Sequence, residues 1–250
     1  MSEDIGPHIS IKAEKIFEIF GFPVTNSLIT SIIVTIITII LAVYYKKQTT
    51  ASKKNGFYYL MKFFVNSIYE MFRSVLGDKI DKFFPILFSF FFYILLQNWF
   101  GLLPGIGSIL IRITEGHEQI LVPLFRGNNA DLNTTLGLAL ISVSLIQYYS
   151  IKYMGIKGYL KKFLNFTNPI MFFLGILEII SEISKVVSFA FRLFGNIFAG
   201  EVLLTIIAFL VPVLASFPFI LLEIFVGLIQ ALVFAMLTTV FISNAIAEHH

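Results

Sequence analysis

The C-terminal part of this chain places ionisable side chains in segments that are otherwise strongly apolar. Six of them fall between residues 169 and 247: Glu178, Glu182, Lys185, Arg192, Glu201 and Glu223. A charge at the centre of a lipid bilayer costs about 3 kcal/mol on insertion scales. These side chains must therefore face protein or water. Such residues mark the path of an ion through a membrane, and Arg192, deep in an apolar helix, is the strongest candidate.

Helical spacing groups some of these residues into one face. Positions seven apart lie close together on a helix that turns about 100° per residue, and Glu178, Lys185 and Arg192 form such a series. Ser188 lies about 40° to one side of Arg192, and Asn196 lies about 40° to the other. The pattern predicts a polar stripe centred on Arg192.

The remaining polar positions belong to other faces. Glu201 is nine residues beyond Arg192, about 180° away on the helix, so it must face a different environment. Glu223 and Gln230 are seven residues apart and share a face of the following helix.

Pairing within the helix is the competing interpretation for Lys185, with either Glu182 or Glu178 as its partner. The interpretation of pairing within the helix is weaker for Arg192. Fourteen residues separate Arg192 from Glu178, and a fully apolar run begins at Val202 on the other side. A side chain in that position cannot easily extend to the membrane surface.

The composition excludes a water-soluble fold. Of the 250 residues, 57% are hydrophobic and 13% are charged, and the mean hydropathy is +0.87. Soluble domains carry about 25% charged residues. The chain is predicted to be an all-α integral membrane protein. Its lysines cluster between apolar segments, which indicates loop orientation rather than nucleic-acid binding.

Metal and disulfide chemistry is not expected. The chain has no cysteine, which excludes disulfides and thiolate ligands. The four histidines, His8, His117, His249 and His250, are scattered or terminal and have no ligand spacing within an apolar segment. We predict neither a metal site nor a cofactor.

The apolar runs predict one membrane domain, residues 1–250, with five transmembrane helices. Its parts are an outer N-terminal segment (1–27), three spans (28–45, 83–103 and 132–151), an amphipathic surface helix (57–77) and a helical hairpin (169–247). A soluble linker is the alternative for 57–77. The connection 104–130 is expected to be a polar loop that begins with a turn at 104–107, and 152–162 is expected to be a short basic loop.

The hairpin is unusual in length. Pro169 suits the start of a helix, and no other proline occurs before Pro212. That allows about 42 residues, or about 63 Å, roughly twice the bilayer core. Such a helix must tilt, bend or break, and Gly175, Gly195 and Gly200 are the candidate weak points. Residues 212–218 make the turn, and a second long helix is expected over 219–247.

Lysine and arginine counts predict the orientation. Segments 46–82 and 152–162 hold twelve, whereas the N-terminal tail and segment 104–130 hold four. Basic loops stay on the inner side of a membrane. The N-terminus is therefore expected outside and the C-terminus inside.

The segment around Arg192 resembles a family signature. Ser188-Phe-Ala-Phe-Arg-Leu-Phe-Gly-Asn-Ile-Phe-Ala-Gly-Glu201 resembles that of subunit a of F-type ATP synthases. Four further segments are similar in the same order: Asn98–Pro104, Asn129–Thr135 with Lys152–Gly158, Gln230–Val240 and the Glu248-His-His tail. The resemblance covers about residues 7–250.

The resemblance implies a mechanism. Subunit a lies beside a rotating ring of c subunits and offers protons two offset half-channels. Arg192 would face the ring carboxylates, and Asn196 and Gln230 would line the site near it. A nearby cation favours the charged carboxylate and hence proton release. A guanidinium is always protonated and cannot relay the proton, so it would separate the half-channels.

The other polar residues take places in the half-channels by the same resemblance. Glu201 and Glu223 would belong to the half-channel that opens outside, and Glu178 and Ser188 would border the inner path. Some family members have histidine at the position of Glu201 or Glu223. Some have an acid where this chain has Gly101.

The implied function is proton translocation coupled to rotary ATP synthesis by a non-catalytic subunit. The chain has no Gly-rich P-loop for nucleotide chemistry. The implied partners are the c-ring, the b subunits of the peripheral stalk and the lipid membrane, with no nucleic acid and no small-molecule substrate beyond protons. Sodium coupling is an alternative. The expected location is the inner (plasma) membrane of a bacterium, with an organelle membrane as the alternative.

Two other classes of function stay open at this point. A stand-alone secondary transporter could use Arg192 to bind an anionic substrate, although no internal repeat is evident. A structural membrane anchor would need no transport at all.

Overall fold

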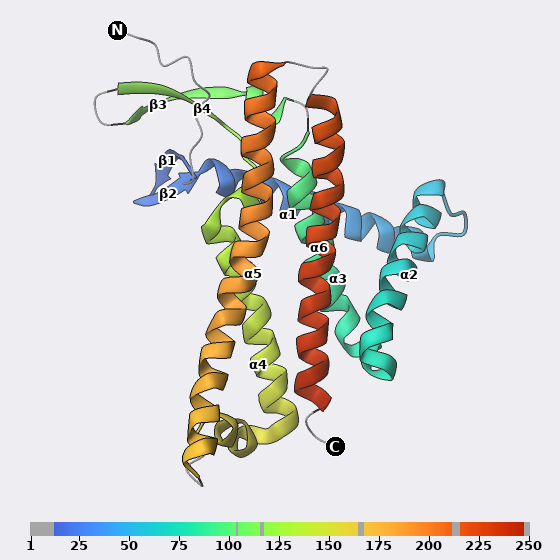
Figure 1. The fold of residues 1–250 in the computed structure, drawn as a ribbon. Coiled ribbons are helices and arrows are strands. Elements are labelled where there is room, and N and C mark those ends of the chain that lie inside the picture. Colours follow the sequence, from blue (N-terminus) through green and yellow to red (C-terminus); the bar gives the residue numbers. More distant parts are fainter. Residues whose placement is uncertain (1–12, 104, 116–117, 165–167, 212–215, 248–250) are drawn as a thin grey trace. The chain divides into compact units, whose positions relative to one another are not determined.

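The computed structural model describes residues 13–103, 105–115, 118–164, 168–211 and 216–247 (Figure 1). Its long helices are α1 (Asn26–Thr50), α2 (Gly56–Leu76), α3 (Ile80–Phe100), α4 (Leu132–Phe163), α5 (Pro169–Leu210) and α6 (Ser216–Ala247). The strands are β1 (Lys15–Ile19), β2 (Phe22–Thr25), β3 (Leu110–Glu115) and β4 (Glu118–Pro123). Short 3-10 turns occupy Gly77–Lys79, Ile106–Ser108 and Asn128–Ala130.

The described chain contains five stretches of helix that are long and apolar enough to cross a membrane. They are Asn26–Thr50, Gly56–Phe100, Leu132–Phe163, Pro169–Leu210 and Ser216–Ile246. The prediction of a multi-pass, all-α membrane protein is confirmed. The orientation, the placing of 57–77 at the membrane surface and the oblique course of the hairpin stay predictions.

Contacts along the chain define two compact units. The first unit contains Met1–Lys54, Phe92–Thr134 and Leu193–Ala231, and the second contains Asn55–Phe91, Thr135–Arg192 and Leu232–His250. Helices α3, α4, α5 and α6 each contribute residues to both units. The two units are described in turn.

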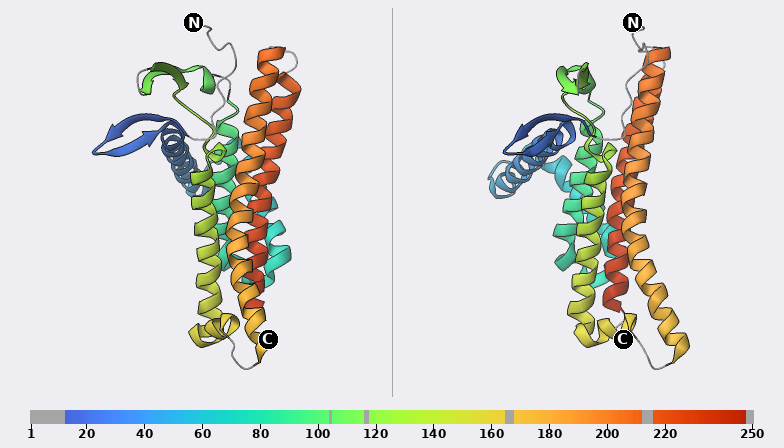
Figure 2. Two further views of the ribbon diagram at one scale, coloured as in Figure 1. Left: turned by 60° about the vertical axis from the view of Figure 1, so that its left-hand side comes forward. Right: turned by 90° about the vertical axis from the view of Figure 1, so that its left-hand side faces the viewer.

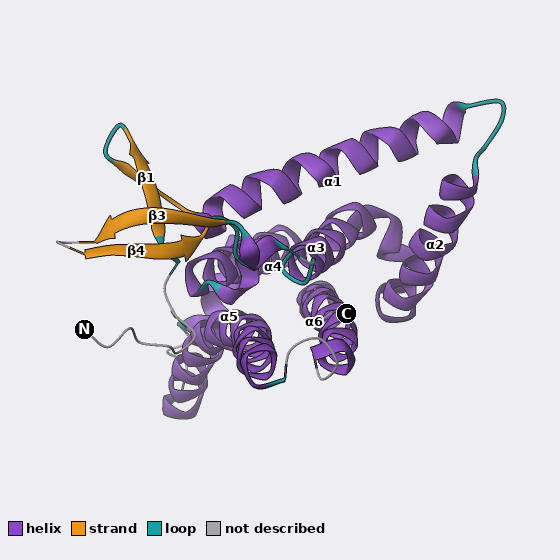
Figure 3. Cartoon of the chain, turned by 90° about the horizontal axis from the view of Figure 1, so that it is seen from above, coloured by secondary structure: helices purple, strands orange, loops and turns teal. Residues whose placement is uncertain are grey.

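In the first unit, α1 follows directly on the hairpin of β1 and β2 (Figure 3). The Thr25 hydroxyl accepts a hydrogen bond from the Leu28 amide at 3.2 Å and caps the helix. The helix continues past Lys46 and Lys47 because lysine is a good helix former. The span predicted at 28–45 is thus longer at both ends.

Two small antiparallel hairpins depart from the predicted connections. β1 pairs with β2 around a turn at Phe20 and Gly21, both with positive φ. β3 pairs with β4, with Ile111 opposite Val122. The expectation of a polar loop over 104–130 is therefore wrong in its central part. Alternating β-branched residues in that segment favour paired strands over an irregular loop. Pro104, where a turn was predicted, lies outside the described residues.

In the second unit, one face of α2 packs against the beginning of α3. Asn55 caps α2 by accepting a hydrogen bond from the Tyr58 amide at 3.1 Å. Ring contacts then join the two helices: Tyr69 meets Phe84 at 5.0 Å, and Phe64 meets Phe91 at 5.6 Å between centroids. The helix predicted over 57–77 is present, and its aromatic residues form part of the core of the second unit.

Helix α4 corrects the predicted basic loop. It runs to Phe163 and is interrupted at Gly155, whose backbone (φ 73°, ψ 157°) is not helical. The last part of the helix turns away from the main axis there (Figure 2). Residues 152–162 are thus mostly helical, since leucine and lysine favour helix on either side of the glycine. Alongside, Ser142 of α4 and Thr238 of α6 are hydrogen-bonded at 2.8 Å.

Helix α5 confirms the predicted 42-residue length. It continues unbroken through all three glycines proposed as weak points. Gly175 serves packing instead, because a Cβ there would collide with the Phe163 carbonyl of α4. α6 begins at Ser216 rather than 219, because Pro218 lies in the first turn, where no amide hydrogen is needed. The turn predicted over 212–218 is therefore wrong at 216–218, and its residues 212–215 lie outside the described residues.

Gly155→Ala tests the break in α4. Its backbone lies in a region essentially restricted to glycine, so alanine is expected to destabilise the fold by about 1–3 kcal/mol. Gly158→Ala is the matched control, because Gly158 has no positive φ and alanine gains up to about 1 kcal/mol in a helix. The midpoint of thermal unfolding, measured in detergent, should fall for Gly155→Ala only. Equal midpoints would contradict the strained geometry.

Candidate functional site

A cavity of about 220 Å³ lies within the first unit. Two carboxylates line it, Glu201 of α5 and Glu223 of α6. The other lining residues come from the end of α3, the segments around β3 and β4, and α5: Asn98, Gly101, Leu102, Ile106, Gly107, Pro123, Phe125, Arg126, Gly127, Ile197, Leu204 and Thr205. Residues far apart in the sequence thus converge on two acidic groups.

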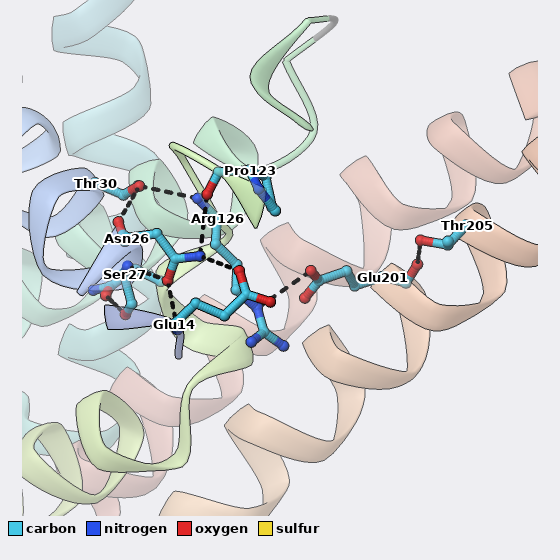
Figure 4. Close-up of polar contacts among 9 residues, drawn as sticks. Glu14, Asn26, Ser27, Thr30, Pro123, Arg126, Glu201 and Thr205 are labelled. Atoms are coloured by element: carbon cyan, nitrogen blue, oxygen red, sulfur yellow. Dashed lines mark hydrogen bonds and ion pairs between the residues drawn. The ribbon is translucent and has the colours of Figure 1, made fainter. Parts of the chain in front are cut away.

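An ion pair fixes one of these carboxylates. Arg126 places its Nε 3.3 Å from Oε1 of Glu201 (Figure 4). The Arg126 side chain is only 5% exposed, whereas that of Glu201 is 39% exposed. A buried guanidinium is tolerated because an opposite charge compensates it.

Hydrogen bonds attach the Arg126 segment to the start of α1. The Arg126 amide donates to the Thr30 hydroxyl at 3.3 Å, and the Asn26 side chain donates to the Pro123 carbonyl at 3.3 Å. Asn26 also donates to the Glu14 carboxylate at 3.2 Å (Figure 4). The segment that carries Arg126 is therefore held at several points.

Glu223 occupies a space that only a glycine leaves. A Cβ on Gly200 of α5 would collide with the Glu223 carboxylate. The neighbouring turns of α6 are held from α3: Asn98 donates to the Gly227 carbonyl at 2.9 Å, and the Trp99 indole donates to the Ile224 carbonyl at 3.0 Å. These hydrogen bonds hold the part of α6 that carries Glu223 against α3.

Asn196 and Gln230 form a direct contact in the first unit. The side-chain amide of Asn196 donates a hydrogen bond to Oε1 of Gln230 at 2.7 Å. Gln230 is buried in α6, so this bond satisfies one of its polar atoms.

A second cavity, of about 270 Å³, lies within the second unit. Arg192 lines it, together with Lys185, three serines and three apolar residues: Ser181, Ser184, Ser188, Phe189, Leu237 and Phe241. Arg192 donates to the Ser188 hydroxyl at 3.1 Å and is exposed. Among the described residues, no carboxylate forms an ion pair with it.

The acidic residues earlier in α5 are paired. Lys185 lies 2.7 Å from Glu182, which decides between its two candidate partners. Glu178 instead pairs with Lys162 of α4 at 2.9 Å. Gln147 of α4 donates to Glu182 at 2.5 Å. The intrahelical interpretation therefore holds for Lys185 with Glu182 and not for Glu178.

The structure groups the predicted site residues into pairs rather than one continuous stripe. Glu201 and Glu223 share a cavity, Asn196 bonds Gln230, and Arg192 bonds Ser188. Within the described part of the chain, no cluster of three His, Cys, Asp or Glu side chains could hold a metal ion. All four histidines lie outside the described residues, as does the Glu248-His-His tail.

Arg126 and Asn98 were not predicted as site residues. Arg126 counted only as one charge of a polar loop, and Asn98 only as part of a similar motif. A buried role for Arg126 has no local signal, because its partner Glu201 lies 75 residues further on.

Known proteins match this chain over most of its length. A sequence model of the ATP synthase A chain family matches residues 28–243. The chain belongs to the ATP synthase A chain family. The resemblance seen in the sequence is thereby confirmed.

Individual relatives agree with the family match. The ATP synthase subunit a of Desulforamulus reducens is 35% identical over 71% of this chain and 63% of the relative, less than two thirds of its length. That of Moorella thermoacetica is 29% identical over 76% and 77% of the two chains. The chloroplastic subunit a of Oedogonium cardiacum is 34% identical over 75% and 71%.

The family match includes both cavities. Residues 28–243 contain Arg126, Arg192, Glu201 and Glu223, and they leave out Glu14. The hydrogen bond that Glu14 accepts from Asn26 thus comes from a part of the chain outside the matched range.

Single thiols would test whether the first cavity holds water. The chain has no cysteine, so Thr205→Cys, in the cavity wall, and Leu203→Cys, exposed outside it, form a clean pair. A small water-soluble methanethiosulfonate should label the first about tenfold faster in membranes, because the reactive thiolate forms in water and not in lipid. Equal rates would contradict a hydrated cavity.

Proposed function

We propose that this chain is the subunit a that moves protons through the membrane sector of an F-type ATP synthase. Two half-channels would meet the c-ring, and proton flow between them would drive ring rotation and ATP synthesis. The observation that carries the proposal is Arg192: an exposed guanidinium in an apolar helix, lining a cavity, with no ion-pair partner among the described residues.

The chemistry of Arg192 fits a barrier rather than a relay. A guanidinium keeps its proton and has no acceptor, so protons cannot pass through it. Its charge favours the ionised form of a carboxylate that comes within reach, which promotes proton release from a passing ring subunit. An arginine already neutralised by this chain's own carboxylates would not attract that partner.

The first cavity is suited to be the half-channel open to the outside. Glu201 and Glu223 can each accept and release a proton, and both line the cavity. Its volume of about 220 Å³ has room for several waters at about 30 Å³ each. Asn196 and Gln230 would complete the lining near Arg192.

The second cavity is suited to be the inner half-channel. The hydroxyls of Ser181, Ser184 and Ser188 line it and can both donate and accept hydrogen bonds. Glu178, paired with Lys162, would border the inner end of the path.

Partners and location follow from the same proposal. The chain would act as a non-catalytic subunit within one membrane domain, beside the c-ring and the b subunits of the peripheral stalk. The bacterial relatives favour the plasma membrane of a bacterium, and the chloroplastic relative keeps an organelle membrane as the alternative. Protons are the proposed ion, and sodium is the alternative.

Arg192→Ala tests the proposal in the assembled complex. We expect ATP-driven acidification of inverted vesicles to fall to background, because the barrier and the counter-charge are both lost. Arg73→Ala is the matched control, since Arg73 is exposed on α2 and only loosely paired with Glu70 at 3.7 Å; it should pump normally. Normal pumping by Arg192→Ala would refute the proposed role.

Gly200→Ala tests whether Glu223 works from its observed position. The new methyl group would displace the Glu223 carboxylate, and misplacing a reacting group can slow a process about ten- to a hundredfold. Gly137→Ala in α4 is the control, because a Cβ there meets no heavy atom within 4 Å. Vesicle acidification at equal complex content should fall for Gly200→Ala alone. Unchanged pumping would remove Glu223 from the path.

A further inference from the structure

The two carboxylates of the first cavity are not equivalent. Arg126 is the one cation among the described residues that line this cavity. It pairs with Glu201 and not with Glu223. Among the described residues, no ion pair or hydrogen bond reaches the Glu223 side chain.

The burial of Arg126 requires an opposite charge beside it, and Glu201 supplies one. Its side chain is almost fully enclosed, and a buried charge without a partner strongly destabilises its surroundings. The contact joins one guanidinium nitrogen, Nε, to one carboxylate oxygen at 3.3 Å, so the attraction between the charges holds the carboxylate. The pair therefore holds the Glu201 carboxylate in one place.

The backbone around Arg126 is held by hydrogen bonds on both sides. Its amide is bonded to Thr30, and the preceding Pro123 carbonyl is bonded to Asn26. On the other side, the Asn128 carboxamide oxygen accepts from Ser27 at 2.7 Å and from Thr134 at 3.2 Å. The polar first turn of α1 thus holds the segment that carries Arg126, and Arg126 in turn holds Glu201.

We propose that Arg126 is a positioning residue that holds Glu201 stationary at the cavity wall. Glu223, seated against Gly200 without a cation, is then the carboxyl group that turns and exchanges its proton with water. The two carboxyl groups have different roles: Glu201 supplies fixed negative charge, and Glu223 carries the proton. This assignment rests on the proposed function of the first cavity as a half-channel.

The test compares four variants in inverted vesicles of the whole complex: Arg126→Gln, Arg126→Lys, Glu201→Gln and the double variant Arg126→Gln/Glu201→Gln. Arg112→Gln is the matched control, because Arg112 is an exposed arginine of β3 in the same connection. ATP-driven acidification and passive proton conduction after removal of the catalytic sector are both measured. Each is normalised to the complex content determined by immunoblot.

Arg126→Gln should lower both rates about tenfold, while Arg126→Lys should restore at least about half of the loss, because it returns the charge. In the Glu201→Gln background, Arg126→Gln should add less than about a twofold loss, since paired residues are not additive. Arg112→Gln should match the wild type. If Arg126→Gln lowers the complex content, the double variant should restore it, because the Arg126–Glu201 pair then loses both of its charges.

The positioning role would be overturned if Arg126→Gln lowered the rates by the same factor in the wild type and in Glu201→Gln. It would also be overturned if Arg126→Lys did not restore the rates, or if the double variant did not restore the complex content. Unchanged rates for Arg126→Gln would do so as well. Normal pumping by Glu201→Gln would instead remove Glu201 from the path and contradict the proposed function itself. Impaired Glu201→Gln with normal Arg126→Gln would overturn only the role of Arg126.

Discussion

The cost of holding charge in helices that cross lipid governs how this chain is built. Six ionisable residues lie between 169 and 247, and four of them are neutralised in pairs. Glu178 meets Lys162, Glu182 meets Lys185, and Glu201 meets Arg126. Two of these cations come from other segments of the chain, α4 and the connection before it. A neighbouring helix and a connection between helices therefore supply countercharge to α5.

Glycines serve a related purpose. Length alone suggested that the glycines of α5 would let an overlong helix bend or break. Instead the helix is continuous, and two of those glycines mark close approaches: Gly175 against the Phe163 carbonyl and Gly200 against the Glu223 carboxylate. A polar group can lie directly against the backbone there because no side chain intervenes. In the first unit, Gly101 and Gly127 make a similar close contact beside Arg126.

Much of this architecture could be read from the sequence, because hydrophobic length and proline placement are local signals. They gave the length of α5 and most helix bounds to within about five residues, but α4 continues twelve residues beyond its predicted end at 151. The hairpin of β3 and β4 was missed because a short paired segment between spans resembles a polar loop in composition. The candidate site was only partly accessible. Glu201 and Glu223 stood out as charges in apolar segments, and the family resemblance assigned them to a half-channel. The role of Arg126 depends on a contact across 75 residues, and no periodicity reports such a contact.

The pairing pattern leaves two residues of α5 and α6 apart from the rest. Among the described residues, Arg192 and Glu223 alone of those six have no ion-pair partner. A charge committed to a fixed partner cannot respond to groups that come and go, since breaking a buried pair is costly. An unpaired guanidinium can instead meet successive carboxylates of a moving partner, and an unpaired carboxyl group can exchange protons with water. In the proposed function, the fixed pairs form a static framework, Glu223 exchanges protons with water, and Arg192 supplies the charge that protons cannot cross.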